Sequence, residues 1–177
     1  EHESIRNQKN TVPIRVNKDG YIDLEMLDNV LKNIYNKNKT IVSIMFANNE
    51  TGIIQPIKKV SDIVLKYNVA LHTDGVQVVG RIGIDFSKLG IDMMTISSHK
   101  IGGPTGAGAL IVSSEHKVLE PILSGGQQEN SIRSGTEPLL AIAGFGEAAE
   151  HTDVDKIKKL KTLRIIFENK LKAADLG

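Results

Sequence analysis

The segment that decides the fold runs from residue 41 to residue 74 and reads IVSIMFANNETGIIQPIKKVSDIVLKYNVALHTD. Its first part, residues 41–47, is an apolar run rich in β-branched residues, typical of a strand covered on both faces in a parallel sheet. After a polar loop at 48–52, apolar residues recur at helical spacing: Ile57, Val60, Ile63, Val64 and Tyr67. A second strand is predicted from residue 69 to residue 74. Strand, helix and strand at this spacing predict a βαβ unit.

Upstream of this unit, the sequence predicts a short strand and a helix. Residues 12–16 have a strand-like pattern, and the turn residues 17–20 follow them. Asp23 is placed to cap a helix, because its carboxylate can accept hydrogen bonds from the backbone N–H groups of the first turn. The helix has apolar residues at helical spacing: Leu24, Leu27, Leu31 and Ile34. We expect it to end near Asn36.

Downstream, the same alternation of strand and helix continues. A strand is predicted from Asp92 to Ser97, followed by a glycine-rich turn at 102–108 and a strand from Ala109 to Val112. Two helices follow, one from about Pro138 to Glu150 and one that Asp153 caps. The pattern predicts an α/β fold in which helices flank a mostly parallel sheet.

Composition excludes several classes of function. The chain has 177 residues, with 22 Lys and Arg against 21 Asp and Glu, and a net charge of +1. This balance does not favour nucleic acid as a partner, and no apolar stretch is long enough to span a bilayer. The chain has no Cys, so it can form neither a disulfide nor a thiolate metal site. It opens without Met or a signal region, and we expect it to be an excerpt of a longer protein.

Polar side chains follow three of the predicted strands. They come at residues 48–50, at 72–74 with Gln77 close behind, and at 97–100. Ligands of open α/β sheets bind beyond the carboxyl ends of the strands, so these residues are the candidate site.

Two of these residues suggest a specific chemistry. Lys100 lies beside a glycine-rich turn, where an amine shielded from water can act as a nucleophile toward an aldehyde. Asp74, one strand away, could hold a cationic ring nitrogen through a charge-assisted hydrogen bond. A lysine that forms a Schiff base and a carboxylate against a pyridinium nitrogen together describe pyridoxal 5'-phosphate. A metal site at His72, Asp74 and His99 is the alternative reading of the same residues.

Four stretches make the resemblance to a known family specific. They are SIMFANNETG at 43–52, HTDGVQ at 72–77, SSHKIGGP at 97–104 and RSGT at 133–136. In order and separation they resemble the motifs of the cysteine desulfurases, pyridoxal-phosphate enzymes of aminotransferase class V. The similarity extends from the start of the chain to about Glu150. It implies the large domain of a pyridoxal-phosphate-dependent transferase of fold type I.

The resemblance also implies roles for individual residues. Lys100 would form the Schiff base, and Asp74 would pair with the pyridine nitrogen. His2 would stack on the ring and take part in proton transfer. The resemblance assigns the remaining cofactor contacts to five more residues: Asn49 and Gln77 for the phenolic oxygen, and Ser97, His99 and Thr136 for the phosphate. Thr136 would reach in from the partner subunit of a homodimer.

The implied reaction is the release of sulfur from L-cysteine, which leaves L-alanine. The sulfur would pass to an acceptor protein such as an iron-sulfur scaffold, in the cytoplasm. Residues 1–152 would be part of the cofactor-binding large domain, and 153–177 a helix that leads toward a small C-terminal domain. The family's sulfur-accepting Cys and substrate-binding Arg have no counterpart in this sequence, and Gln127 stands where the family commonly has a third glycine. Three alternatives therefore stay open: a selenocysteine lyase, an aminotransferase, and a non-catalytic α/β interaction module.

Overall fold

The centre of the molecule is a four-stranded sheet in the order β1-β2-β3-β4. The computed structural model describes residues 1–114, 120–121 and 123–174. Its strands are β1 (Ile41–Met45), β2 (Ala70–Asp74), β3 (Met93–Ser97) and β4 (Gly108–Val112). β1, β2 and β3 run parallel to one another, and β4 runs antiparallel to β3. The predicted mostly parallel α/β sheet is therefore confirmed.

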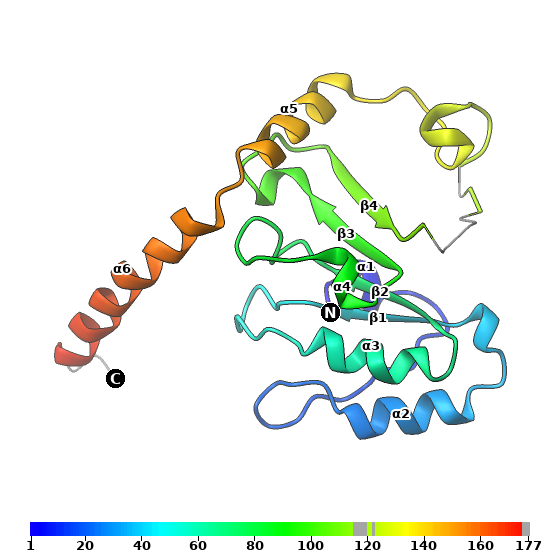
Figure 1. The fold of residues 1–177 in the computed structure, drawn as a ribbon, viewed down its shortest axis with the longest axis horizontal. Helices are drawn as coiled ribbons and strands as arrows, with labels where there is room; N and C mark the ends of the chain where they lie inside the picture. The colour runs from blue at the N-terminus through cyan, green and yellow to red at the C-terminus, as the bar shows by residue number, and fades with distance from the viewer. Residues whose placement is uncertain (115–119, 122, 175–177) are drawn as a thin grey trace.

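Helices cover one face of this sheet. α3 (Ile57–Leu65) contacts β2, and α2 (Leu24–Asn33) lies side by side with α3, as Figure 1 shows. The residues they bury against the strands are almost all aliphatic. The most deeply buried large side chains of this core are Leu27, Leu31, Ile57, Val60, Val64, Leu71, Val78 and Met94. The βαβ unit predicted from residues 41–74 is thus the part of the chain around which the core forms.

The predicted caps account for where the helices begin. Asp23 accepts a hydrogen bond of 2.9 Å from the Met26 backbone N–H, and this contact caps α2. α2 ends at Asn33, three residues before the expected end, because the Ile34 backbone is already extended with ψ at 125°. Asp153 likewise caps α6 (Val154–Ala173), accepting from the Asp155 and Lys156 backbone N–H groups.

The last two long helices have little contact with the core. α5 (Leu139–Glu150) touches the 3-10 turn η2 (Ser98–Lys100) that follows β3. From the end of α5, α6 extends away from the sheet (Figure 1). Its apolar side chains are exposed, Phe167 by 62% and Leu163 by 62%. The assignment of 1–152 and 153–177 to two parts stays a prediction, and residues 175–177 lie outside the described residues.

The predicted strand at 12–16 is wrong. In this segment only Val16 makes a β-type contact, an isolated antiparallel bridge to Ile22 on the far side of the turn at 17–20. Pro13 has no backbone N–H to donate to a ladder, and Val12 is 62% exposed. The local pattern of residues 12–16 is suitable for a strand, but no strand among the described residues pairs with this segment.

Besides η2, four short helical segments among the described residues were not predicted. They are α1 (Glu3–Arg6), η1 (Lys37–Lys39), α4 (Phe86–Leu89) and η3 (Gln128–Ser131). Each has only three or four residues, too few for an apolar period to be visible in the sequence. α4 nevertheless has a clear start and end, because Asp85 caps it and Gly90 follows it in the left-handed region with φ at 67°.

Candidate active site

The carboxyl ends of the three parallel strands lie next to one another. Asp74, at the end of β2, is the register partner of Met45 on β1 and of Thr95 on β3. The ladder continues one step beyond the strands, where the Phe46 N–H donates to the Asp74 carbonyl at 2.9 Å. The three polar segments predicted as the candidate site therefore meet at one edge of the sheet.

Asp74 is held rigidly although it lies at the strand end. Its side chain is only 9% exposed, and its Oδ1 accepts a hydrogen bond of 2.9 Å from the Val76 backbone N–H. Among the residues that the structure describes, no Lys or Arg forms an ion pair with it. A buried carboxylate with an oxygen free of cations is suited to a cationic ligand group.

The beginning of the chain lies beside this carboxylate. The Glu1 side chain accepts a hydrogen bond of 2.7 Å from the Met45 backbone N–H, on the residue that pairs with Asp74. Partial burial raises the pKa of the Glu1 carboxyl above its ordinary value of 4.5, and the charge of Asp74 raises it further. The next residue, His2, caps α1 by accepting from the Ser4 N–H at 3.2 Å. His2 is therefore the neighbour of the residue that contacts the end of β1, and its role at the site stays a prediction.

Lys100 and the predicted phosphate residues follow β3 directly. Ser97 ends the strand, and its hydroxyl lies 3.0 Å from His99 Nδ1. Lys100 is half-buried, and it lines a groove of about 340 Å³ together with Arg81, His151 and other residues at the junction of α5 and α6. Because β2 and β3 are adjacent and parallel, position 100 follows the end of one strand and position 74 ends its neighbour. The two positions are on one edge of the sheet, while the groove that Lys100 lines does not include Asp74, and the role of Lys100 stays a prediction.

The last three predicted residues differ in their placement. Asn49 is exposed in the turn after β1, a turn that Asn48 shapes by accepting from the Glu50 and Thr51 N–H groups. Gln77 is half-buried three residues after Asp74. Thr136 is exposed and follows η3, a segment that lies away from the carboxyl ends of β1–β3 (Figure 1). Within this chain, Thr136 does not lie beside the other predicted site residues. Its contribution to the site of a second subunit stays a prediction.

The donor set fits the cofactor that the sequence predicts. A carboxylate, an amine, and a hydroxyl paired with an imidazole suit, in turn, a cationic ring nitrogen, an aldehyde and a phosphate. By contrast, no cluster of metal-ligating side chains forms within residues 1–114, 120–121 and 123–174. His72, which the alternative metal reading needs, has both ring nitrogens within 2.8 Å of hydroxyl oxygens. The roles of the individual residues stay predictions.

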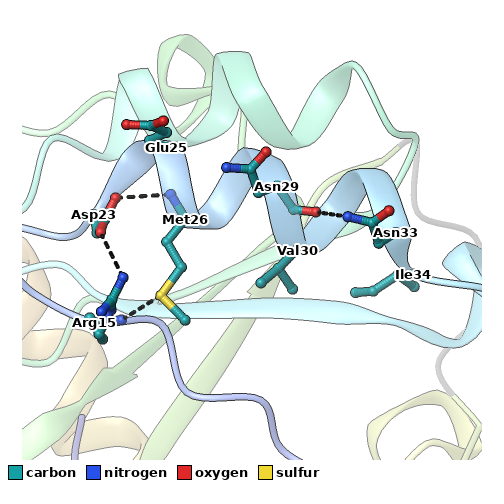
Figure 2. Close-up of a pocket in the computed structure, with 8 residues that line it drawn as sticks. All are labelled: Arg15, Asp23, Glu25, Met26, Asn29, Val30, Asn33 and Ile34. Atoms are coloured by element: carbon teal, nitrogen blue, oxygen red, sulfur yellow. Dashed lines mark hydrogen bonds and ion pairs between the residues drawn. The ribbon is translucent and has the colours of Figure 1, made fainter.

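A second hollow of the surface lies elsewhere. It has a volume of about 610 Å³ and lies beside α2, where Figure 2 shows Arg15, Met26 and Asn33 among the residues that line it. The Arg15 guanidinium is 3.8 Å from the capping carboxylate of Asp23, and its backbone N–H points to the Met26 sulfur at 3.4 Å. These contacts hold the incoming chain against α2. No predicted site residue lines this hollow.

Two features of the site were not predicted from the sequence. His72 joins β1 and β3 through its ring, and Glu1 binds the edge of β1. Sequence signals existed for both, because His72 stands two residues before Asp74 and Glu1 directly precedes His2. What the sequence does not reveal is the partner of each, 23 to 44 residues away along the chain.

Comparison with known proteins is consistent with this arrangement. The family model described as aminotransferase class-V matches residues 3–174. The chain is 41% identical over 155 residues to cysteine desulfurase IscS of Dictyoglomus turgidum, a match that covers 86% of this chain and 38% of that protein. It is 46% identical over 137 residues to the mitochondrial cysteine desulfurase of Saccharomyces cerevisiae, covering 77% and 27%.

A solved structure gives a similar result. The NifS-like protein from Rickettsia africae superposes with a TM-score of 0.89 and 46% sequence identity. The match covers 98% of this chain and 49% of that protein. The chain therefore spans less than half the length of each of these three relatives. In the described part of this chain, no helix has the length and apolar character needed to cross a membrane.

Proposed function

This chain belongs to the aminotransferase class-V family, and on that premise we propose that it is part of a pyridoxal 5'-phosphate-dependent cysteine desulfurase. The whole protein would break the C–S bond of L-cysteine, pass the sulfur to an acceptor and leave L-alanine. The observation that supports this most strongly is the meeting of Asp74, Ser97, His99 and Lys100 at one edge of the sheet. Relatives named cysteine desulfurase indicate the substrate.

The residues of this chain would divide the work of binding and proton transfer. When bound, the cofactor supplies an electron sink for the carbon next to the substrate amine. Asp74 would hold its ring nitrogen protonated, and Lys100 would anchor it and move a proton at that substrate carbon. Six further residues would complete the contacts: His2 on the ring face, Asn49 and Gln77 at the phenolic oxygen, and Ser97, His99 and Thr136 at the phosphate.

The sulfur acceptor must lie outside these 177 residues. The chain contains no Cys, and a thiolate is the nucleophile that accepts sulfur as a persulfide. We propose that the sulfur goes on to an acceptor protein such as an iron-sulfur scaffold. The predicted cytoplasmic location is part of the same proposal. Because the yeast relative is named as mitochondrial, cell fractionation decides between the two compartments.

The first experiment asks whether the complete protein, expressed from its full reading frame, binds the cofactor through Lys100. We expect a yellow protein whose visible absorbance borohydride bleaches. Lys100→Ala should abolish that absorbance, whereas Lys32→Ala, which removes an exposed lysine on α2, should leave it unchanged. A wild-type protein that stays colourless after incubation with pyridoxal 5'-phosphate contradicts the proposal.

A second measurement distinguishes cysteine desulfurase from the alternatives within the family. The yellow protein is supplied with L-cysteine and a thiol reductant, and L-alanine and sulfide are measured. Formation of both in equal amounts supports the proposal. Turnover of L-selenocysteine alone would identify a selenocysteine lyase, and amino transfer to an oxo acid would identify an aminotransferase. A protein that binds the cofactor but converts none of these substrates would favour a binding module.

The homodimer is tested by mixing subunits. Lys100→Ala and Thr136→Val subunits are unfolded together and refolded, or co-expressed with different tags. If Thr136 serves the partner's site, each mixed dimer contains one intact site and recovers about half of the wild-type activity. If Thr136 serves its own subunit, both sites of the mixed dimer are damaged and mixing restores nothing; if it serves neither site, Thr136→Val subunits are already active on their own.

A further inference from the structure

A buried histidine on β2 contacts both neighbouring strands, β1 and β3, at whose carboxyl ends the candidate site lies. His72 is 7% exposed and lies in the middle of β2. Its Nδ1 is 2.8 Å from the Ser43 hydroxyl on β1, and its Nε2 is 2.8 Å from the Thr95 hydroxyl on β3. One nitrogen of a neutral imidazole donates and the other accepts, so this ring can satisfy both hydroxyls at once. We call these three residues the Ser43–His72–Thr95 bridge.

The far end of the bridge reaches the immediate surroundings of Asp74. Ser43 is the register partner of His72, but Thr95 is the register partner of Asp74, so the ring crosses diagonally toward the strand end. The Thr95 carbonyl in turn accepts a hydrogen bond of 2.9 Å from the N–H of Gly75, the residue after Asp74. Thr95 is thus bound through its side chain to His72 and through its backbone to the turn that orients the carboxylate.

The bridge places no positive charge beside Asp74. Burial lowers the pKa of His72 below its ordinary value of 6.5, against the opposing effect of the Asp74 charge. The ring is therefore neutral at pH 7 and leaves the charge of Asp74 uncompensated. Asp74 on the same strand is the charge that acts on the His72 ring, Glu1 lies near Asp74, and the Arg81 guanidinium donates to the Val76 carbonyl in the turn after Asp74. The facing residues of β1 and β3 are uncharged: Ser43, Met45, Met93 and Thr95.

We propose that His72 is a positioning residue, which acts through Thr95 to fix the Asp74 carboxylate for the ring nitrogen of the cofactor. This inference rests on the proposed function, in which Asp74 contacts that nitrogen. It differs from a merely structural role in one respect. If His72 acts through Asp74, its removal matters for cofactor binding only while Asp74 is present.

A double-mutant cycle tests this difference. In the complete protein, His72→Leu is made alone, together with Asp74→Asn, and compared with Asp74→Asn alone. The dissociation constant for pyridoxal 5'-phosphate and the visible spectrum of the bound cofactor are measured, together with the unfolding temperature of the cofactor-free protein. With Asp74 present, we expect His72→Leu to weaken binding by roughly tenfold and to shift the spectrum. In the Asp74→Asn background, we expect a change of less than about twofold.

Two further variants control for loss of stability. His72→Gln retains one donor and one acceptor at position 72, so binding should stay within about threefold of wild type. Thr73→Val removes a buried hydrogen bond from the neighbouring residue to the Ile44 carbonyl, on the opposite face of β2. It should lower the unfolding temperature without moving the cofactor spectrum. If His72→Leu does not fold, Thr95→Val removes only the far end of the bridge and is used in the same cycle.

The outcomes separate this inference from the proposed function. If His72→Leu weakens binding equally with and without Asp74, His72 is only structural, and the inference is overturned while the proposed function stands. If Thr73→Val shifts the spectrum as His72→Leu does, the effect comes from stability, and the inference is likewise overturned. If the wild-type complete protein does not bind pyridoxal 5'-phosphate at all, both are overturned.

Discussion

The two faces of β2 are both buried but differ in chemistry. Leu71 and Thr73 point to the face that α2 and α3 cover and are 1% and 0% exposed. His72 and Asp74 point to the other face and are 7% and 9% exposed. The first face is packed with aliphatic side chains, whereas the second holds hydrogen-bonded polar groups. One five-residue strand therefore stabilises the fold with alternate residues and presents the candidate site with the residues between them.

The largest effect is expected on the apolar face. Leu71→Ala removes a fully buried side chain between the sheet and α3, and it should lower the free energy of unfolding by about 3 kcal/mol. Urea denaturation followed by circular dichroism measures the change. If the protein still folds at working temperature, the spectrum of the bound cofactor should stay that of wild type. A shifted spectrum would show that the two faces are not independent.

The next effect is expected on the polar face. Asp74→Asn keeps the shape of the side chain but removes its charge, so affinity for pyridoxal 5'-phosphate should fall by roughly 10- to 100-fold. Because Asn can still accept the hydrogen bond from the Val76 N–H, the unfolding temperature should change little. Fluorescence or absorbance titration with the cofactor gives the affinity. A large loss of stability with unchanged affinity would reverse the comparison between the faces.

Ser98, in the turn η2 after β3, differs from the buried polar residues of β2, whose side chains form hydrogen bonds. Its side chain is 0% exposed, and its hydroxyl has no hydrogen-bond partner among the described residues. Ser98→Ala removes the unpaired hydroxyl without leaving a large cavity, so it should raise the free energy of unfolding by about 1 kcal/mol. The matched control is Thr73→Val, which deletes a hydroxyl that does have a partner and should destabilise. Equal signs for the two variants would contradict this distinction.

The smallest effect is a pH dependence. Because burial lowers the pKa of His72 in the folded state, the unfolded chain binds this proton first as the pH falls below 6.5. Stability should therefore decline from pH 6.5 downward until His72 is protonated in the folded state as well. Glu1 acts in the opposite sense, since its raised pKa makes the folded state bind a proton first as the pH falls toward 4.5. Unfolding curves of His72→Gln and Glu1→Gln across this range separate the two.

Local signals in the sequence were enough to predict most of the fold. The cap at Asp23, the helical spacing in 57–67 and the apolar run at 41–47 each depend on neighbours within a few residues. The structure confirms these elements, although α3 ends at Leu65 and β1 at Met45. The strand at 12–16 failed because a strand needs a partner, which a local pattern cannot supply. The location of the candidate site could be predicted from the sequence, because parallel strands bring their carboxyl ends to one edge of the sheet.

The internal support of the site could not be predicted in the same way. His72 makes its two contacts with residues 29 and 23 positions away in the sequence. Many serines and threonines of the chain could equally have faced it, and only the register of the three strands selects Ser43 and Thr95. Sequence motifs thus indicate which groups do chemistry, while the groups that hold them depend on strand register.

The reversal of β4 has a consequence for how this edge tolerates change during evolution. The chain leaves β3 and returns to β4 at the same edge through residues 102–107, in which Gly102 and Gly106 have φ values of 92° and 88°. Main-chain groups close the loop onto η2, with the Ser98 N–H donating to the Ala107 carbonyl at 3.2 Å and the Gly103 N–H to the Ser98 carbonyl at 3.0 Å. Because main-chain groups form this loop, its shape depends on the number of residues in it. Replacing an exposed side chain such as Thr105 should change that shape less. We therefore expect a change in the length of residues 102–107 to alter the space at this edge more than a point substitution would.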